Sequence, residues 1–99
     1  MGAGWVGILS AELHFPENRS LKGKRKELLS AKAQLQRRFG ASVAEVDHHD
    51  LWQRSTLTVA CAARSAHDAE ELAATAERWL ASGDWVLTRC DRLLVSPED

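Results

Sequence analysis

Two helical patterns, each flanked by segments that alternate apolar and polar residues, constrain the fold of this chain most strongly. Residues 5–15 alternate in this way until Pro16 ends the pattern. Ser20 is a good N-cap, apolar residues then recur at helical spacing up to Phe39, and Gly40 provides a C-terminal stop. These signals predict a strand followed by a helix of about five turns.

The rest of the chain continues this arrangement. A short strand, a turn, a longer strand, a capped helix and a last strand are predicted in that order, over residues 42–46, 47–51, 52–63, 65–83 and 85–95. We expect residues 96–99 to form a frayed tail. With 99 residues, the chain is long enough for one core, so we predict one domain over residues 1–99.

The resulting order is βαββαβ. With right-handed crossovers and no threaded loop, this order predicts an α+β, ferredoxin-like two-layer sandwich: a four-stranded antiparallel sheet with two helices on one face. The first strand then lies between the third and the fourth. Cys61 and Cys90 would sit on strands separated by the first one, about 10 Å apart at the usual strand spacing. That separation is too large for a disulfide.

Charge and hydropathy exclude several classes of protein. Thirteen Lys and Arg against fourteen Asp and Glu give a net charge of -1, so nucleic-acid binding would depend on a local patch. No stretch of the sequence approaches the ~20 apolar residues of a membrane span, and the first residues lack the charged start of a secretory signal. We therefore expect a cytoplasmic protein with no membrane partner.

The turn between the second and third predicted strands is unusually rich in polar and aromatic side chains. Residues 47–54 read Asp-His-His-Asp-Leu-Trp-Gln-Arg, whereas a turn that only reverses the chain favours Gly or Asn. Adjacent side chains diverge and the usual ligand spacings are missing, so we predict no metal and no cofactor. Hydrogen bonding within the turn is the expected role of Asp47, His49, Asp50 and Gln53.

A basic cluster surrounds the start of the first helix. Its members are Arg19, Lys22, Lys24, Arg25 and Lys26. Cations at a helix N-terminus cost about 0.3 to 1 kcal/mol each at low salt, so something should offset them. Either an anion bound at the free backbone N–H groups does so, or Glu17, Asp47 and Asp50 pair with the cations. The sequence is compatible with both explanations. The predicted topology brings the basic cluster and the turn at residues 47–54 to the same end of the domain.

Three motifs together resemble the YlxP-like family of small bacterial proteins of unknown function. They are Glu-Leu-His-Phe-Pro at 12–16, Ser-Leu-Lys-Gly-Lys-Arg at 20–25, and the stretch 44–54. Gly23 and His49 depart from the family pattern, where an acidic residue and a glutamine are frequent. The resemblance implies a ferredoxin-like fold, a bacterial cytoplasmic protein, and a gene lying among those for transcription elongation, translation initiation and ribosome maturation, which is an associational hint toward RNA.

The leading hypothesis is a non-enzymatic accessory factor that binds RNA or a ribosomal subunit. The basic cluster would contact phosphates, and the neighbouring contact surface would be His48, Trp52 and Arg54.

Two alternatives remain. A self-assembling or protein-binding module would use the helix-free sheet face, on which we expect Trp52, Arg54 and Ile8 among others. A small phosphate-ligand enzyme would use His48 as acid or base and needs a pocket between the turn and the first helix. No nucleophile or second positioned group is marked as a partner for His48, so the sequence favours a protein without enzymatic activity.

Overall fold

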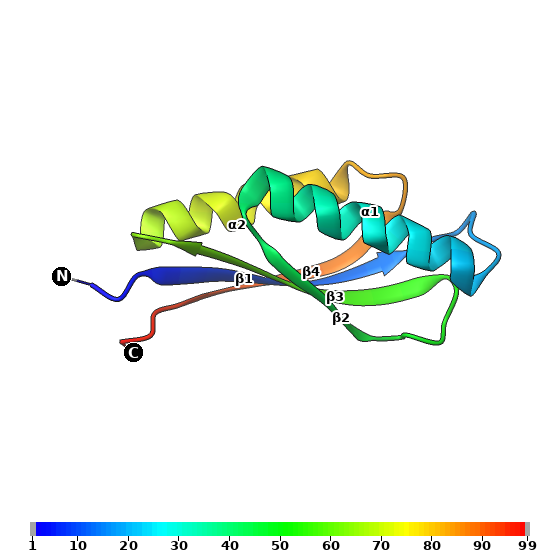
Figure 1. Cartoon of the computed structure of the whole chain (residues 1–99), viewed down its shortest axis with the longest axis horizontal. Helices are drawn as coiled ribbons and strands as arrows, with labels where there is room; N and C mark the ends of the chain where they lie inside the picture. Colours follow the sequence, from blue (N-terminus) through cyan, green and yellow to red (C-terminus); the bar gives the residue numbers. More distant parts are fainter. Residues whose placement is uncertain (1, 99) are drawn as a thin grey trace.

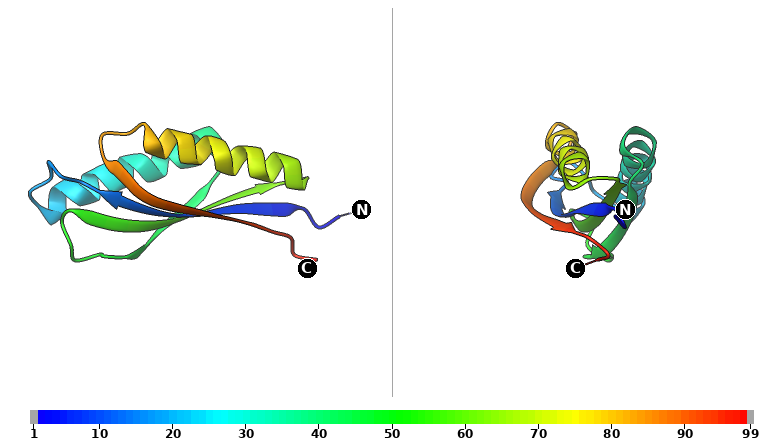
Figure 2. Two further views of the ribbon diagram at one scale, coloured as in Figure 1. Left: turned by 180° about the vertical axis from the view of Figure 1, so that it is seen from behind. Right: turned by 90° about the vertical axis from the view of Figure 1, so that its left-hand side faces the viewer.

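The computed structural model describes residues 2–98 and has the predicted βαββαβ order. Its elements are β1 (Trp5–His14), α1 (Leu21–Phe39), β2 (Ser42–Asp47), β3 (Arg54–Ala63), α2 (Ala66–Ala81) and β4 (Val86–Val95). The four strands form an antiparallel sheet in the order β2-β3-β1-β4. Both helices lie on one face of this sheet (Figures 1 and 2). The predicted ferredoxin-like fold is therefore confirmed.

Both helices begin at the predicted caps. The Ser20 hydroxyl accepts a hydrogen bond from the Gly23 N–H at 3.0 Å, and the Ser65 hydroxyl accepts one from the Asp68 N–H at 3.1 Å. Such bonds satisfy N–H groups that the first helical turn leaves free. At the other end of α1, Gly40 adopts a left-handed conformation with φ of 62°, which glycine takes without strain.

Two element boundaries differ from the prediction by two residues, and the ends of β1 and β2 and the start of β4 differ by one. Helix α2 ends at Ala81 rather than Gly83, and β3 begins at Arg54 rather than Trp52. The Gln53 side chain explains the later start of β3, because its amide donates a hydrogen bond to the Asn18 carbonyl at 3.2 Å and holds this part of the chain in a bend. Trp52 therefore lies in the loop before β3, and its predicted place on the open sheet face was wrong.

The core lies between the two helices and the inward side of β1 and β3. Leu9, Leu57 and Val59 are completely buried there, as the alternation of β1 and β3 predicted. Gly7 of β1 is also buried, and a Cβ atom at this position would lie only 2.5 Å from the Ala69 carbonyl oxygen of α2. Helix α2 therefore packs directly on the backbone of β1.

The two cysteines are both free, as predicted from their separation in the sheet. Cys61 is buried on β3, whereas Cys90 is half-buried on β4. Burial raises the pKa of the Cys61 thiol, so it stays protonated near neutral pH.

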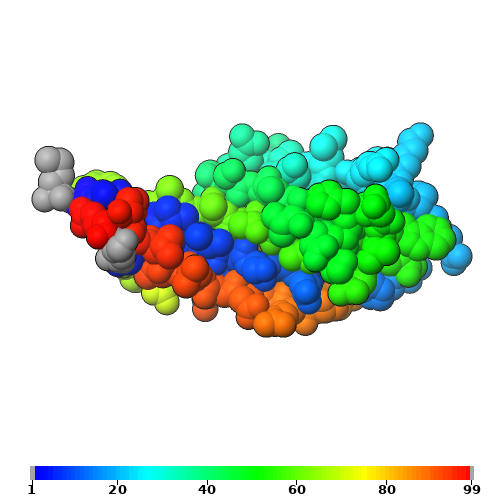
Figure 3. Space-filling model, turned by 90° about the horizontal axis from the view of Figure 1, so that it is seen from below, coloured from blue at the N-terminus to red at the C-terminus, as the bar shows by residue number. Residues whose placement is uncertain are grey.

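Figure 3 shows the side of the molecule opposite the helices. The residues of this helix-free sheet face divide it into an apolar half and a polar half. In the half near the chain ends, Val6 pairs with Val95 and Ile8 pairs with Leu93, which is 59% exposed. The other half carries polar residues from β1, β3 and β4: Ser10, Glu12, His14, Thr56, Thr58, Arg89 and Asp91.

The first and last described residues are tied together. The Ser96 hydroxyl donates a hydrogen bond to the Gly4 carbonyl at 3.0 Å, and the Ala3 N–H donates one to the Glu98 carboxylate at 2.8 Å. Residues 96–98 are thus held in place rather than frayed, and Asp99 of the predicted tail lies outside the described residues. Neither helix is long and apolar enough to cross a membrane within residues 2–98.

Candidate recognition surface

Two loops meet at the end of the molecule opposite the chain termini (Figures 1 and 2). The Phe15 N–H donates a hydrogen bond to the Gln53 carbonyl at 2.8 Å, and the Gln53 side-chain amide donates one to Pro16 at 3.4 Å. These bonds join the β1–α1 loop to the β2–β3 loop. We call this end of the molecule, residues 15–26 and 47–54, the tip.

Asn18 links the two segments of the tip. Its side-chain amide donates hydrogen bonds to the Ser20 carbonyl at 2.7 Å and to the Trp52 carbonyl. Gly23 leaves room for this amide, because a Cβ atom at position 23 would collide with the Asn18 side-chain oxygen. Neither Asn18 nor Gly23 was predicted as a site residue.

Lys24 lies inside the tip rather than on its surface. The side chain is completely buried. Its ammonium group donates hydrogen bonds to the carbonyls of His48, His49 and Arg54 at 2.7, 3.2 and 3.1 Å. It also pairs with the Glu45 carboxylate at 3.1 Å. The expectation that Lys24 contacts an external phosphate is therefore corrected, because its ammonium group is enclosed by internal oxygen atoms.

Glu45 completes the buried network around Lys24. Its side chain is 18% exposed, and the Ser55 hydroxyl donates a hydrogen bond to it at 2.7 Å. Burial alone would raise the pKa of Glu45, but hydrogen bonds from Ser55 and Lys24, together with the charge of Lys24, outweigh burial and lower this pKa. The Glu45 carboxylate is therefore ionised at neutral pH.

The positions of Lys24 and Glu45 in the sequence contain a signal for this network. Lys24 stands four residues before Leu28 and seven before Ala31, so it belongs to the apolar stripe of α1. Glu45 pairs across the sheet with Leu57, which places it on the helix-covered side of β2. Two opposite charges at apolar positions of adjacent elements indicate a buried ion pair.

The turn after β2 holds His48 in an uncommon backbone conformation. His48 has φ of 64°, the only positive φ among non-glycine residues of the described chain. The Asp47 carboxylate accepts a hydrogen bond from the His48 N–H at 2.8 Å, and Lys24 binds the His48 carbonyl. Histidine is among the residues that tolerate this conformation better than most, and bonds on both sides hold it.

The remaining cations of the basic cluster are exposed. They are Arg19, Lys22, Arg25 and Lys26. Arg54 is exposed as well, but it pairs with His14 across the sheet and lies on the helix-free face, as predicted. Within residues 2–98, ion pairs join Lys24 to Glu45, Asp47 to His48, Arg89 to Asp91, and Arg92 to Glu77. Glu17 and Asp50 therefore pair with none of the five exposed cations in the described part of the chain. The first turn of α1 also contains no acidic residue.

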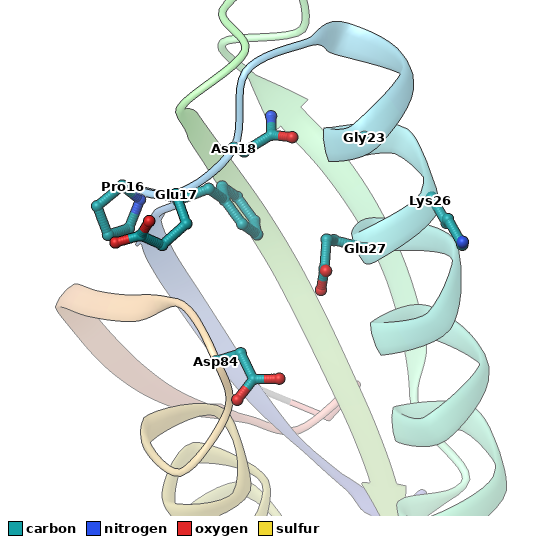
Figure 4. Close-up of a pocket in the computed structure, with 8 residues that line it drawn as sticks. Pro16, Glu17, Asn18, Gly23, Lys26, Glu27 and Asp84 are labelled. Atoms are coloured by element: carbon teal, nitrogen blue, oxygen red, sulfur yellow. The ribbon is translucent and has the colours of Figure 1, made fainter.

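The exposed cations do not all lie on one side of α1. Successive residues of a helix are about 100° apart, so Lys26 points to a different side from Arg25. Lys26 borders a pocket of about 340 Å³ between the start of α1 and the α2–β4 loop. Figure 4 shows Glu27 and Asp84 on the two sides of this pocket, with the Lys26 ammonium directed away. The pocket has an acidic lining that also includes Glu17.

The alternative of an enzyme that uses His48 needs a pocket that this histidine lines. The residues that line the acidic pocket do not include His48 or any other histidine. His48 Nδ1 lies 3.9 Å from Asp47, a carboxylate on the adjacent residue. No group of three or more His, Cys, Asp or Glu among residues 2–98 is arranged to hold a metal ion.

Comparison with known proteins identifies the family of the chain. No curated protein matches the sequence. The family described as "Protein of unknown function (DUF503)" matches residues 6–91, which run from the second residue of β1 into β4. The chain therefore belongs to the DUF503 family, in agreement with its resemblance to the YlxP-like proteins.

Proposed function

We propose that this protein is a non-enzymatic accessory factor that binds RNA, on or near the ribosome, through its tip. The observation that carries the proposal is the set of exposed cations without carboxylate partners around the start of α1: Arg19, Lys22 and Arg25. Arg54, at the start of β3, adds a further exposed cation to the tip. Such cations are unfavourable at a helix N-terminus in the free protein, and RNA phosphates would offset that cost.

The proposed contact surface is smaller than the sequence suggested. Lys24 is left out because it is buried, and Lys26 is left out because it borders the acidic pocket. His48, Trp52 and Arg54 stay in it because hydrogen bonds join their part of the chain to the β1–α1 loop, which carries Arg19. The genes that surround those of YlxP-like proteins add an associational hint in the same direction.

Binding of the purified protein to ribosomal subunits and to structured ribosomal RNA should weaken steeply with salt. Each phosphate contact contributes about 0.7 to 0.9 to the slope of log affinity against log salt. Replacing Arg19, Lys22 and Arg25 together with alanine should reduce this slope by about 2 to 3 and weaken binding at least about tenfold. Fluorescence anisotropy over a salt series measures both quantities.

The matched control is a variant that loses three positive charges outside the tip. Arg37, Arg38 and Arg64 are also exposed, and they lie outside the tip. Replacing these three with alanine should leave the slope nearly unchanged. Equal losses for the two triple variants, or wild-type protein that binds neither probe, would contradict the proposal.

A second candidate function is self-assembly through the apolar half of the open sheet face. The exposure of Leu93 beside Ile8 favours it, because a patch that is apolar throughout can pack against its own copy around a two-fold axis. Native mass spectrometry should then find a dimer that Ile8→Glu or Leu93→Glu converts to monomer. Leu29→Glu, at a position of α1 that is 71% exposed and away from the sheet face, should leave the dimer intact; a monomeric wild type would rule this candidate out.

A further inference from the structure

We infer that the RNA bound by the tip presents an unpaired nucleotide, and that its base stacks on Trp52. This inference rests on the proposed function and narrows it to a class of RNA. It is carried by three observations: the exposure of Trp52, the rigidity of the loop that carries it, and the arrangement of charge around it.

Trp52 is a large aromatic residue that the fold leaves half exposed. It is 50% exposed, and its neighbour Leu51 is 43% exposed. Trp79 and Trp85, by contrast, pack against one another with ring centroids 5.9 Å apart at the edge of the core. An exposed indole offers a flat surface on which any base can stack, regardless of its identity.

The loop around Trp52 is held in place from inside the protein. Lys24 binds the carbonyls of His48 and His49 at its start and of Arg54 at its end. Asn18 binds the carbonyl of Trp52 itself. Because the backbone is fixed before any ligand arrives, little ordering cost opposes binding at Trp52.

The charges around Trp52 suit a single nucleotide better than a duplex. Exposed cations lie on the α1 side of the tip, but the Asp47 side chain is 71% exposed and Asp50 is exposed on the same loop as Trp52. A continuous duplex backbone laid across this end would bring phosphates against those carboxylates. One flipped-out base on Trp52 needs only its adjacent phosphates to be neutralised, and Arg19 follows Asn18, whose amide binds the Trp52 carbonyl.

Two RNA hairpins that differ by one nucleotide test the inference. One has a fully paired stem and the other has the same stem with a single bulged adenine. The bulged hairpin should bind at least about tenfold more tightly, and Trp52→Ala should remove this difference while Trp52→Phe retains most of it. In protein labelled with 5-fluorotryptophan, the fluorine resonance assigned to Trp52 should shift on binding, and those of Trp79 and Trp85 should not.

The outcomes separate this inference from the proposed function. Equal, salt-dependent binding of the two hairpins with an unmoved Trp52 resonance would overturn the inference and leave RNA binding intact. Binding of neither hairpin, nor of ribosomal RNA, would overturn both. Loss of a protein partner on Trp52→Ala, with RNA binding unaffected, would assign Trp52 to a protein contact and overturn the inference as well.

Discussion

Replacing Lys24 with methionine should lower the free energy of unfolding by about 3 to 5 kcal/mol. Methionine fills a similar volume but donates no hydrogen bond, so the Glu45 carboxylate and the carbonyls of His48, His49 and Arg54 would lose a partner at once. Buried polar groups without partners account for most of such a loss. Urea denaturation followed by far-ultraviolet circular dichroism measures the change.

A double variant separates the ion pair from the rest of the network. The variant with both Lys24→Met and Glu45→Leu should lose less free energy of unfolding than the two single variants lose together. The difference should be about 1 to 3 kcal/mol, because the double variant no longer buries an unpaired carboxylate. Recovery should be incomplete, since the three carbonyls stay without their donor. Lys22→Met, on the exposed side of α1, should change stability by less than about 0.5 kcal/mol. A Lys24→Met protein as stable as the wild type would show that its ammonium is not needed inside the tip.

Gly7→Ala should cost about 3 kcal/mol, near the upper end of what overpacking usually costs. The added methyl group would lie 2.5 Å from the Ala69 carbonyl oxygen and 2.9 Å from the Ala73 Cβ, both on α2. The first of these atoms belongs to helix backbone, so relief requires α2 to move away from the sheet. Thermal and urea unfolding should both show the loss.

Gly2→Ala provides the comparison for this prediction. A methyl group at Gly2 would have its nearest neighbours at 3.9 and 4.0 Å, which is ordinary contact, so stability should hardly change. Comparable losses for the two variants would show that the contact between α2 and β1 is not their cause, because the effect of Gly→Ala on the unfolded chain favours folding.

The fold was predictable because local signals agreed with one another. The N-caps Ser20 and Ser65 both make the expected hydrogen bonds, and Gly40 ends α1 in the expected conformation. The start of β3 was not predictable, because tryptophan favours strands and only a contact between distant segments, from Gln53 to Asn18, turns the chain before β3 begins.

The hydrogen bonds inside the tip were harder to predict than the two loops that form it. The topology indicated which loops would meet, and they do. The buried Lys24 ammonium group binds mainly backbone carbonyls. Because every residue has a carbonyl, the residue types in the turn do not indicate which carbonyls accept hydrogen bonds from a lysine. Asn18 acts in the same way on the carbonyls of Ser20 and Trp52, and nothing in its sequence neighbourhood indicates this.

The two ends of the described chain lie together at one end of a molecule whose longest dimension is 50 Å, and the tip lies at the other (Figure 1). A tag, dye or surface attachment placed at either end would therefore stand well away from Trp52 and Arg19. Immobilised through that end, the protein presents its tip to solution, so captured RNA or protein reports on the recognition surface rather than on the attachment.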